Sequence, residues 1–485
     1  MTSRVTTARI DEEQQELLIG GDGSAPDGIE LVGRRAVAAA SDIVTANDGA
    51  AWSAVLPLRA SRWGGPELPL PTGDYALVVD GRTTALPAVE TVVLPGLRVG
   101  SAGGDVQVAA PVDPAYETAE GRLALEGRYA ALPGAGENAV FFEAFYGQSS
   151  GCNPGAIDRE LAARAPGVTR YWSVVDLSVP VPDGAVPVVE GSPEWWRARA
   201  DARLLIVNDW LRRRFDRKPG QRVLQTWHGT PLKRLALHRP GLHPRRWLAV
   251  VRESRRWDVL LAQNPYAERV LRKAYAFLRK PVWVDGYPRN DVLTTGDPAR
   301  IRAALGIDPG DRVLLYAPTW RDDRSEMVDF VDPNALAEAG DCVVLVRGHS
   351  RTIRPGRDQA GSRVIDVTGY PDTAELLLVA DALVTDYSSV MFDFSATGKP
   401  MYFLVPDLEH YRGKLRGFYF DLAARAPGPL VRTQDELVAA LSDVSALAEH
   451  APKYVAWQAQ FNGRDDGAAS ARVVDRILDL GWLEA

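Results

Sequence analysis

The sequence predicts two consecutive Rossmann-like α/β domains that face a cleft, preceded by an all-β, sandwich-like domain. Three observations predict this arrangement. The chain has 485 residues, too many for a single core, so it should divide into several domains. Short apolar runs separated by Gly, Pro and Asp fill the first 130 residues. From Asn138 onward, apolar runs alternate with amphipathic segments, and this pattern occurs in two successive series.

The first 130 residues are predicted to form a β-sandwich that serves as an accessory or binding module. Their apolar runs include residues 75–79, 91–94 and 106–108, separated by turn-forming residues. Short strands at regular spacing are typical of sandwiches. The region contains no histidine and no cysteine, and its carboxylates are scattered, so nothing in it points to catalysis.

Two series of apolar runs predict the two parallel sheets, because strands that alternate with helices form doubly wound sheets. The first series consists of residues 139–142, 170–175, 204–207, 223–224 and 259–261. The second series consists of residues 312–316, 342–346, 364–367, 382–385 and 400–404. Gly, Pro and Asp cluster between residues 286 and 310. We therefore expect domains at 1–130, 131–290 and 291–485, the last ending in a closing helix over residues 468–480.

The composition is that of an ordinary globular protein, with 46% hydrophobic and 25% charged residues. The two cysteines, Cys152 and Cys342, lie far apart in the sequence, which excludes a disulfide framework and a cysteine-rich zinc site. The polar N-terminus lacks the apolar core of a signal peptide, and no run of about 18 apolar residues occurs. We expect a soluble or peripheral protein in a reducing compartment.

The charge is distributed very unevenly along the chain. The net charge is −7, yet residues 203–290 contain 21 Lys and Arg against six Asp and Glu. Such a block attracts anions, for example nucleotide phosphates, polyphosphate polymers or acidic lipids. The alternative interpretation is a solvated, arginine-rich surface without a ligand.

Polar residues follow four of the predicted strands, and in open α/β sheets ligands bind beyond the carboxyl ends of strands. Taken singly, a histidine in a turn or a Ser-Ser pair at a helix start is commonly structural. Together, these endings offer a base and several anion donors, which favours a phosphate-bearing ligand. The endings are Trp227-His228-Gly229-Thr230-Pro231, Pro318-Thr319, Arg347-Gly348-His349 and Ser388-Ser389.

Several common nucleotide-binding motifs are missing from the sequence. It contains neither a P-loop nor a Gly-x-Gly-x-x-Gly after a strand, which argues against a simple NTPase and a nicotinamide enzyme. No Asp-x-Asp triplet follows a strand, and Asp322-Asp323 is interpreted as part of a solvated loop. We expect no bound metal and no required cofactor.

The sequence resembles the CDP-glycerol glycerophosphotransferases of teichoic acid and capsule synthesis. Order and approximate spacing of the matching motifs agree over roughly residues 136–480, whereas the first 130 residues are not covered. The matching motifs are residues 142–147, 152–154, 227–233, 286–291, 317–321, 347–349, 385–389 with Asp393, and 465–470.

The resemblance implies a GT-B fold with a CDP-activated polyol donor bound between the two α/β domains. His228 is then expected to act as the general base on an acceptor hydroxyl, and His349 to balance charge on the pyrophosphate as CMP leaves. Asp393 is expected to contact hydroxyls of the donor, although a buried structural carboxylate is the alternative. The expected donor-binding residues are Trp227, Gly229, Thr230, Pro231, Arg289, Pro318, Thr319, Arg347, Gly348, Ser388, Ser389 and Asp393.

The resemblance also implies partners and a location. The acceptor is expected to be a glycopolymer or a lipid-linked molecule at the cytoplasmic face of the cell membrane, and no nucleic acid partner is expected. Residues 233–257, which are basic and contain tryptophan, are the candidate contact with an anionic membrane surface. Two alternative functions are a GT-B glycosyltransferase that uses a nucleotide sugar and a polymer-binding protein with an inactive transferase unit.

Overall fold

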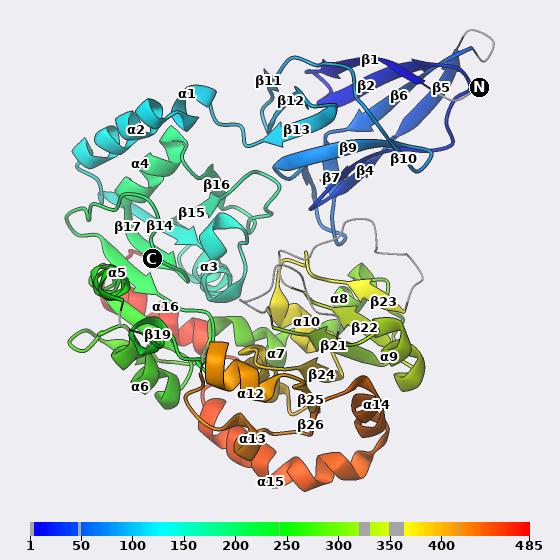
Figure 1. The fold of residues 1–485 in the computed structure, drawn as a ribbon. Helices are drawn as coiled ribbons and strands as arrows, with labels where there is room; N and C mark the ends of the chain where they lie inside the picture. The colour runs from blue at the N-terminus through cyan, green and yellow to red at the C-terminus, as the bar shows by residue number, and fades with distance from the viewer. Residues whose placement is uncertain (1–3, 47–49, 242, 320–329, 349–362, 416) are drawn as a thin grey trace.

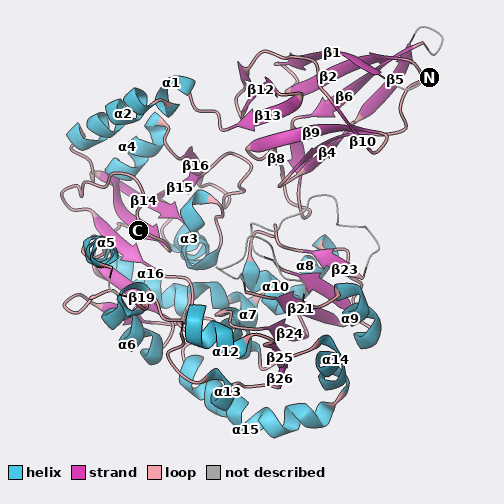
Figure 2. Ribbon diagram, in the orientation of Figure 1, coloured by secondary structure: helices cyan, strands magenta, loops and turns pink. Residues whose placement is uncertain are grey.

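The structure, a computed structural model, describes residues 4–46, 50–241, 243–319, 330–348, 363–415 and 417–485. An all-β region formed by the N-terminal residues lies at one end of the molecule, and two α/β halves lie beside it (Figure 1). Figure 2 separates these parts clearly, because the described residues of the β region are drawn as strands and loops, whereas helices flank the sheets of both α/β halves.

The N-terminal region consists of two antiparallel sheets that share one core. Strands in such a sandwich bury alternate side chains, and in β6 Trp52, Ala54 and Leu56 point inward. The first sheet has the order β1-β2-β6-β5, with β1 Arg4–Asp11, β2 Glu16–Asp22, β5 Asp42–Ala46 and β6 Ala51–Pro57. The second has the order β11-β12-β13-β9-β3-β4 with β10 beside β9, formed by β3 Ile29–Gly33, β4 Val37–Ala39, β9 Gly73–Val79, β10 Arg82–Thr84, β11 Val92–Val93, β12 Arg98–Ala102 and β13 Asp105–Ala109.

A separate two-stranded hairpin leaves this sandwich. It pairs β7 Arg59–Ser61 with β8 Glu67–Pro69 in antiparallel fashion. Its loop, residues 62–66, reaches the second α/β half, where the rings of Trp63 and Tyr370 are 5.5 Å apart. The accessory region therefore contacts the part of the molecule in which the ligand site is expected.

The first α/β half contains a parallel sheet with the order β16-β15-β14-β17-β18-β19-β20. The order reverses between β14 and β17, as in a doubly wound fold. Its strands are β14 Glu137–Glu143, β15 Thr169–Val174, β16 Val186–Val189, β17 Ala202–Val207, β18 Arg222–Gln225, β19 Val259–Ala262 and β20 Val282–Val284. Its helices are α1 Pro114–Glu117, α2 Ala119–Ala131, η2 Phe145–Gly147, α3 Cys152–Arg164, α4 Pro193–Asp201, η3 Ala236–His238, α5 Pro244–Ser254, α6 Pro265–Ala274 and η4 Pro288–Asn290.

The second α/β half repeats this architecture with the parallel order β23-β22-β21-β24-β25-β26. Helices cover both faces, so successive strand residues are buried on opposite sides: Leu314 belongs to one apolar cluster and Leu315 to the other. Its strands are β21 Val313–Ala317, β22 Val343–Val346, β23 Val364–Asp366, β24 Ala382–Thr385, β25 Met401–Leu404 and β26 Leu430–Val431. Its helices are α7 Val292–Thr295, α8 Pro298–Ala304, α9 Pro333–Gly340, α10 Thr373–Val379, α11 Val390–Phe394, η6 Ser395–Thr397, α12 Leu408–His410, η7 Tyr411–Leu415, α13 Leu422–Arg425, α14 Gln434–Ser442 and α15 Val444–Phe461.

The last helix, α16 Ala469–Asp479, returns to the first α/β half. Its buried residues Val473, Val474 and Ile477 belong to the core of that half, and Trp482 stacks on Trp283 with 5.6 Å between ring centroids. The sequence assigned this closing helix to the C-terminal domain, and in space it packs on the other one. The predicted pair of Rossmann-like domains behind an all-β region is confirmed.

Candidate active site

A cavity of about 580 Å³ lies between the two α/β halves, at the carboxyl ends of their strands. In doubly wound sheets, ligands bind at this edge, beyond the carboxyl ends of the strands. The first half contributes the segment 227–233 together with Phe145 and Arg289, and the second half contributes residues 317–319, Arg347, Gly348 and 387–390. Thus eleven residues predicted from the sequence line one cavity together with His228. They are Trp227, Gly229, Thr230, Pro231, Arg289, Pro318, Thr319, Arg347, Gly348, Ser388 and Ser389, and Asp393 also borders it.

The loop that carries His228 is held by side chains from other segments. After β18 ends at Gln225, the Gln225 Oε1 accepts a hydrogen bond from the backbone N–H of Trp227 at 2.9 Å. The Asn153 Nδ2 donates to the carbonyl oxygen of Trp227 at 3.0 Å. Trp227 has φ 53°, a left-handed conformation that is unusual for a large side chain. The loop conformation is therefore imposed by its surroundings.

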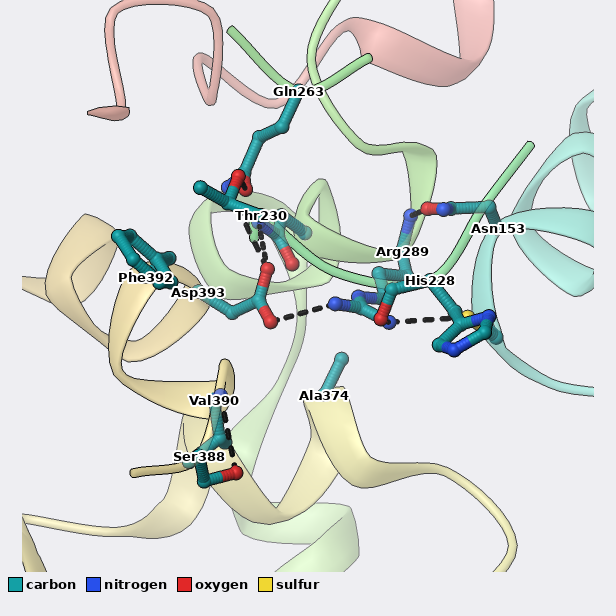
Figure 3. Close-up of polar contacts among 12 residues, drawn as sticks. Asn153, His228, Thr230, Gln263, Arg289, Ala374, Ser388, Val390, Phe392 and Asp393 are labelled. Atoms are coloured by element: carbon teal, nitrogen blue, oxygen red, sulfur yellow. Dashed lines mark hydrogen bonds and ion pairs between the residues drawn. The ribbon is translucent and has the colours of Figure 1, made fainter. Parts of the chain in front are cut away.

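His228 is oriented by a hydrogen bond to the backbone. Its Nδ1 lies 2.7 Å from the carbonyl oxygen of Asn208, which follows β17. A carbonyl oxygen only accepts, so Nδ1 must carry the proton and the lone pair of the neutral ring resides on Nε2. The ring stacks on Trp227 with centroids 4.7 Å apart. The imidazole is thus fixed in the tautomer that a general base requires, and Figure 3 shows it at the edge of the Arg289 cluster.

The carboxyl group of Asp209 interacts electrostatically with His228. Burial raises the pKa of the Asp209 carboxyl, and this effect is opposed by the charge interaction with His228 and by the hydroxyl of Tyr146. Asp209 was missed by the sequence reasoning, although its position two residues after the end of a buried strand was a usable signal.

Gly229 and Thr230 have structural tasks. A Cβ atom at Gly229 would lie 2.7 Å from the Oγ of Ser389 in the other half, so only glycine permits this close approach. The Thr230 hydroxyl is buried and donates to Gln263 Oε1 at 2.6 Å, while Asn264 Nδ2 donates to it at 3.1 Å. Thr230 therefore fastens the loop from within, and its hydroxyl is engaged by protein groups.

Arg289 and Asp393 form an ion pair between the two halves. The Arg289 Nη2 lies 2.6 Å from Asp393 Oδ2, and Nη1 donates to the carbonyl oxygen of His228 at 2.9 Å (Figure 3). Burial raises the pKa of Asp393, and the Arg289 guanidinium opposes that increase. The two residues, both predicted as donor contacts, thus bind each other and tie the His228 loop to α11.

A buried polar network continues from this pair. Asn290 Nδ2 donates to Asp393 Oδ1 at 3.1 Å and lies 3.3 Å from Asp465 Oδ1. Gln263 Nε2 donates to Asp465 Oδ2 at 2.8 Å. Burial raises the pKa of Asp465 to about 6. These contacts join the first half, the second half and the segment before α16.

The wall formed by the second half carries a cation and two hydroxyls. Arg347 Nη1 donates to the carbonyl oxygens of Val367 and Tyr370, at 2.9 and 3.1 Å. Burial lowers the pKa of Arg347 to about 10, so the guanidinium stays charged at neutral pH. Ser388 Oγ accepts from the backbone N–H of Val390 at 3.4 Å, and Ser389 makes no side-chain cap bond to α11.

Of the remaining predicted residues, Thr319 and Gly348 form hydrogen bonds through their backbone, and His349 is not described. The backbone N–H of Thr319 donates to the Asp386 carboxylate at 3.0 Å, and the Gly348 N–H donates to Thr368 Oγ1 at 2.8 Å. His349 and the pair Asp322-Asp323 lie outside the described residues. Among the described residues, no group of three His, Cys, Asp or Glu is placed to hold a metal ion.

Comparison with known families decides the assignment. Residues 129–479 match the family model described as CDP-Glycerol:Poly(glycerophosphate) glycerophosphotransferase, which covers well over half of the chain. The chain belongs to this family. The resemblance inferred from the sequence motifs is confirmed, and the β region before residue 129 lies outside the family match.

Individual relatives support the same membership. The teichoic acid poly(glycerol phosphate) polymerase of Bacillus subtilis (strain 168) is 35% identical over 363 residues, which are 70% of this chain and 48% of that protein. The chain thus matches about half the length of that relative. The teichoic acid glycerol-phosphate transferase of Staphylococcus aureus (strain NCTC 8325 / PS 47) is 34% identical over 372 residues, covering 70% of this chain and 93% of that protein.

Solved structures confirm the GT-B fold. The wall teichoic acid polymerase TagF superimposes with a TM-score of 0.67 at 30% identity, covering 73% of this chain and 92% of that one. A histidine variant of TagF soaked with CDPG superimposes with a TM-score of 0.65 at 29% identity.

Three residues of this chain that position the site had no role in the prediction from the sequence. Asn208, through its backbone carbonyl and through Oδ1, orients His228 and the N–H of Phe145. Asn153 holds Trp227, and Cys152 Sγ accepts from Arg289 Nη1 at 3.2 Å. Phe145 and Cys152 have φ values of 48° and 60°. Such strain, about 1–3 kcal/mol each, clusters at functional sites and is invisible in a sequence.

Proposed function

We propose that the chain transfers glycerol phosphate, or a related polyol phosphate, from a CDP-activated donor to a hydroxyl group of a glycopolymer or lipid-linked acceptor, with release of CMP. This reaction serves the synthesis of teichoic acid or a capsule-like surface polymer. Family membership supports the reaction type. The observation that carries the proposal is the fixed tautomer of His228, facing a cavity whose opposite wall bears Arg347, Ser388 and Ser389.

In the proposed reaction, the acceptor oxygen attacks the β-phosphorus of the donor. A new P–O bond to the acceptor forms while the bond between that phosphorus and the bridging oxygen breaks, and the bridging oxygen leaves as part of CMP. The proton of the acceptor hydroxyl passes to His228 Nε2. General base catalysis of this kind contributes about 10²- to 10⁴-fold to the rate.

Groups on the second half balance the charge that develops on CMP. Arg347 remains protonated and is already fixed by two backbone carbonyls, so little reorganisation is needed when the pyrophosphate bond breaks. The hydroxyls of Ser388 and Ser389 donate to phosphate oxygens from the same wall. His349, next in sequence to Gly348, keeps its proposed role in charge balance on sequence grounds.

The roles of Arg289 and Asp393 in this scheme are changed by their mutual ion pair. Each is satisfied by the other, so we propose that they position the His228 loop against α11. The guanidinium reaches the carbonyl oxygen of His228 itself, which makes the alignment of the base depend on the interdomain pair. Both therefore act on the reaction through another residue.

The deciding experiment is a panel of activated donors with mass analysis of the product. CDP-glycerol, CDP-ribitol, UDP-glucose and GDP-mannose are each incubated with the full chain and an acceptor. We expect CMP release and a mass increase of one polyol phosphate with a CDP donor. Release of UDP or GDP with a sugar mass increase would instead show a nucleotide-sugar glycosyltransferase.

We further propose that α5 contacts the anionic inner face of the cell membrane. Trp247 and Leu248 are 56% and 63% exposed on this helix, and Arg245 and Arg252 are exposed beside them. Basic residues around exposed apolar side chains are typical of helices that lie in the membrane interface. Trp257, at the end of the predicted stretch, is buried in the core and takes no part. No helix among the described residues is long and apolar enough to span a bilayer.

Flotation with lipid vesicles tests this membrane contact. The full chain should float with vesicles containing phosphatidylglycerol and remain unbound with pure phosphatidylcholine. The variant Trp247→Ser/Leu248→Ser should lose most of this binding while its release of CMP with a water-soluble acceptor is retained. Equal flotation of variant and parent would remove α5 from the proposal.

A further inference from the structure

A second cavity, of about 850 Å³, is enclosed by three parts of the molecule. The β7–β8 hairpin forms one wall, the first α/β half forms another, and the loop around Tyr370 with α10 forms the third. Phe145, Arg289, Arg347 and Gly348 line this second cavity and the donor cavity alike. The two spaces are therefore neighbours that meet beside the catalytic base, since Phe145 lies 5.7 Å from the ring of His228.

Hydrogen bonds hold the β7–β8 hairpin, which forms one wall of this cavity, in a defined conformation. Within its loop, Ser61 Oγ donates to the carbonyl oxygen of Gly65 at 2.6 Å, and the Gly65 N–H donates to the carbonyl oxygen of Arg62 at 2.9 Å. Trp63 has φ 56°, a strained conformation for this residue, and its ring meets Tyr370 edge-on at 5.5 Å. A region outside the family match thus holds a strained residue against the cavity.

The side chains that face this cavity suit a polyanion with an organic backbone. Arg62 and Arg300 line it apart from the donor cavity, and Arg289 and Arg347 line both. Two acidic side chains also line it: Asp372, which accepts from the backbone N–H of Ala374 at 2.9 Å, and Glu375, which is engaged by Arg300 and by the hydroxyl of Tyr370 at 2.6 Å. Arginine binds phosphate through directed hydrogen bonds, and rings pack on the carbon atoms of a polyol or sugar.

The Arg62 guanidinium sits where such a chain would pass. A Cβ atom placed on Gly369 would lie only 2.9 Å from Arg62 Nη2, so the absence of a side chain at Gly369 admits the guanidinium to the loop before Tyr370. The Arg62 guanidinium of the hairpin is thereby brought onto the second α/β half. It lines the same cavity as Arg347, and Arg347 also lines the donor cavity.

We propose that this second cavity is the acceptor subsite, in which the hydroxyl-bearing end of a phosphodiester-linked polyol chain lies against the β7–β8 hairpin. The inference rests on the proposed function and extends it. In-line displacement requires the attacking and leaving oxygens on opposite sides of the phosphorus, so acceptor and CMP need separate spaces that meet at the base. The two connected cavities provide that arrangement, and the N-terminal β region selects the acceptor by contributing Arg62 and Trp63.

Arg62→Glu in the full chain tests the proposal, with Arg62→Lys as the conservative variant. Two acceptors are compared at saturating CDP-glycerol: an oligo(glycerol phosphate) and an uncharged glyceryl glycoside. Arg62→Glu should raise KM for the charged acceptor by roughly 10- to 100-fold, the range expected for a lost charged hydrogen bond. KM for the uncharged acceptor and for CDP-glycerol should change by less than about twofold, and Arg62→Lys should recover most of the loss.

Val44→Ala is the matched control. Val44 is 48% exposed on β5, a strand that pairs with neither β7 nor β8, and its replacement should leave all three KM values unchanged. Equal effects of Arg62→Glu on both acceptors, or no effect on either, would overturn the proposal and leave the hairpin as a structural cover.

A binding measurement without donor separates this inference from the proposed function. Calorimetric titration of the full chain with oligo(glycerol phosphate) should show binding that Arg62→Glu weakens by a similar factor and Val44→Ala leaves intact. If CDP-glycerol yields no CMP but this binding pattern holds, the donor assignment fails and the subsite stands. If vesicles of phosphatidylglycerol displace the oligomer competitively, a lipid headgroup occupies the cavity and the proposal is wrong.

Discussion

The two walls of the donor cavity use their polar groups differently. On the first wall, the loop from Trp227 to Pro231 is fastened by Gln225, Asn153, Asn208 and Gln263, so that Nε2 of His228 is the group left for chemistry. On the second wall, the contacts with described residues are fewer: Arg347 Nη1 donates to two backbone carbonyls, and Ser388 Oγ accepts one long bond from the N–H of Val390. We therefore propose that the first wall holds the base and that the second wall receives the anion.

This difference indicates how the two halves divide the reaction. A general base requires one orientation and one tautomer, which many fixed hydrogen bonds supply. A phosphate site requires donors that still have capacity when the ligand arrives. We therefore expect substitutions on the first wall to reduce turnover and substitutions on the second wall to weaken donor binding.

Removal of the base should have the largest effect. His228→Ala should lower the kcat for CMP release by about 10²- to 10⁴-fold, because the acceptor hydroxyl loses its proton acceptor. Initial rates of CMP formation measure this loss. His450→Ala, in α15 and with its Nδ1 bonded to the carbonyl of Ala446, is the control and should retain activity. Turnover of His228→Ala close to the parent rate would end the assignment of the base.

The interdomain ion pair sharpens the comparison because it links the two walls. Arg289→Met should lower the free energy of unfolding by about 3–5 kcal/mol, since a buried Asp393 carboxylate is left without its partner. The double variant Arg289→Met/Asp393→Leu should recover much of that stability. Urea denaturation of Arg289→Met, Asp393→Leu and the double variant gives these values. Additive losses in the double variant would show that the two charges do not depend on each other.

The close approach of the walls predicts a smaller effect that can be reversed. Gly229→Ala places a methyl group 2.7 Å from Ser389 Oγ, so the walls must separate or the loop must shift. We expect a loss in kcat/KM of roughly tenfold, equivalent to about 1.4 kcal/mol. Ser389→Gly added to Gly229→Ala should restore part of the activity relative to Ser389→Gly alone. A loss that Ser389→Gly leaves unchanged would mean that the contact does not set the cavity width.

The smallest expected effect concerns the pH dependence of stability. The pKa of Asp465 is raised from 3.8 to about 6 by burial, so the folded chain binds this proton more tightly than the unfolded chain. The protonated Asp465 carboxyl therefore stabilises the folded chain. This stabilisation is fully present below the pKa of Asp465 in the unfolded chain and is lost as pH rises through about 6. Asp465→Asn lacks this titration, and its Tm relative to the parent should therefore increase between pH 4.5 and 7.5. A constant Tm difference over that range would contradict the assigned shift.

The strand endings explain why much of the site could be predicted. Apolar runs fix where parallel strands end, and ligands bind beyond those ends, so His228, Arg347 and Ser388 could be placed in one cavity from sequence alone. What those side chains bind is decided by distant segments. Nothing in the sequence pairs Arg289 with Asp393, 104 residues away, or brings Asn153 to the His228 loop.

For the N-terminal region, the sequence predicted the fold but not its contact with the rest of the molecule. Its alternating strands indicated a sandwich, and two sheets around a common core were found. The β7–β8 hairpin reaches Tyr370 across about 300 residues of sequence, and this contact depends on how the domains are placed. Local periodicity carries no information on that placement.

Donor affinity measured on variants of each wall tests the division of labour most directly. CDP-glycerol is titrated calorimetrically into His228→Ala and into Ser388→Ala/Ser389→Ala, alongside the parent chain. We predict that His228→Ala binds CDP-glycerol with a Kd within about threefold of the parent while forming CMP about 10²- to 10⁴-fold more slowly, and that the serine variant binds at least about tenfold more weakly. Weakened binding in His228→Ala together with parent-like binding in the serine variant would contradict this prediction.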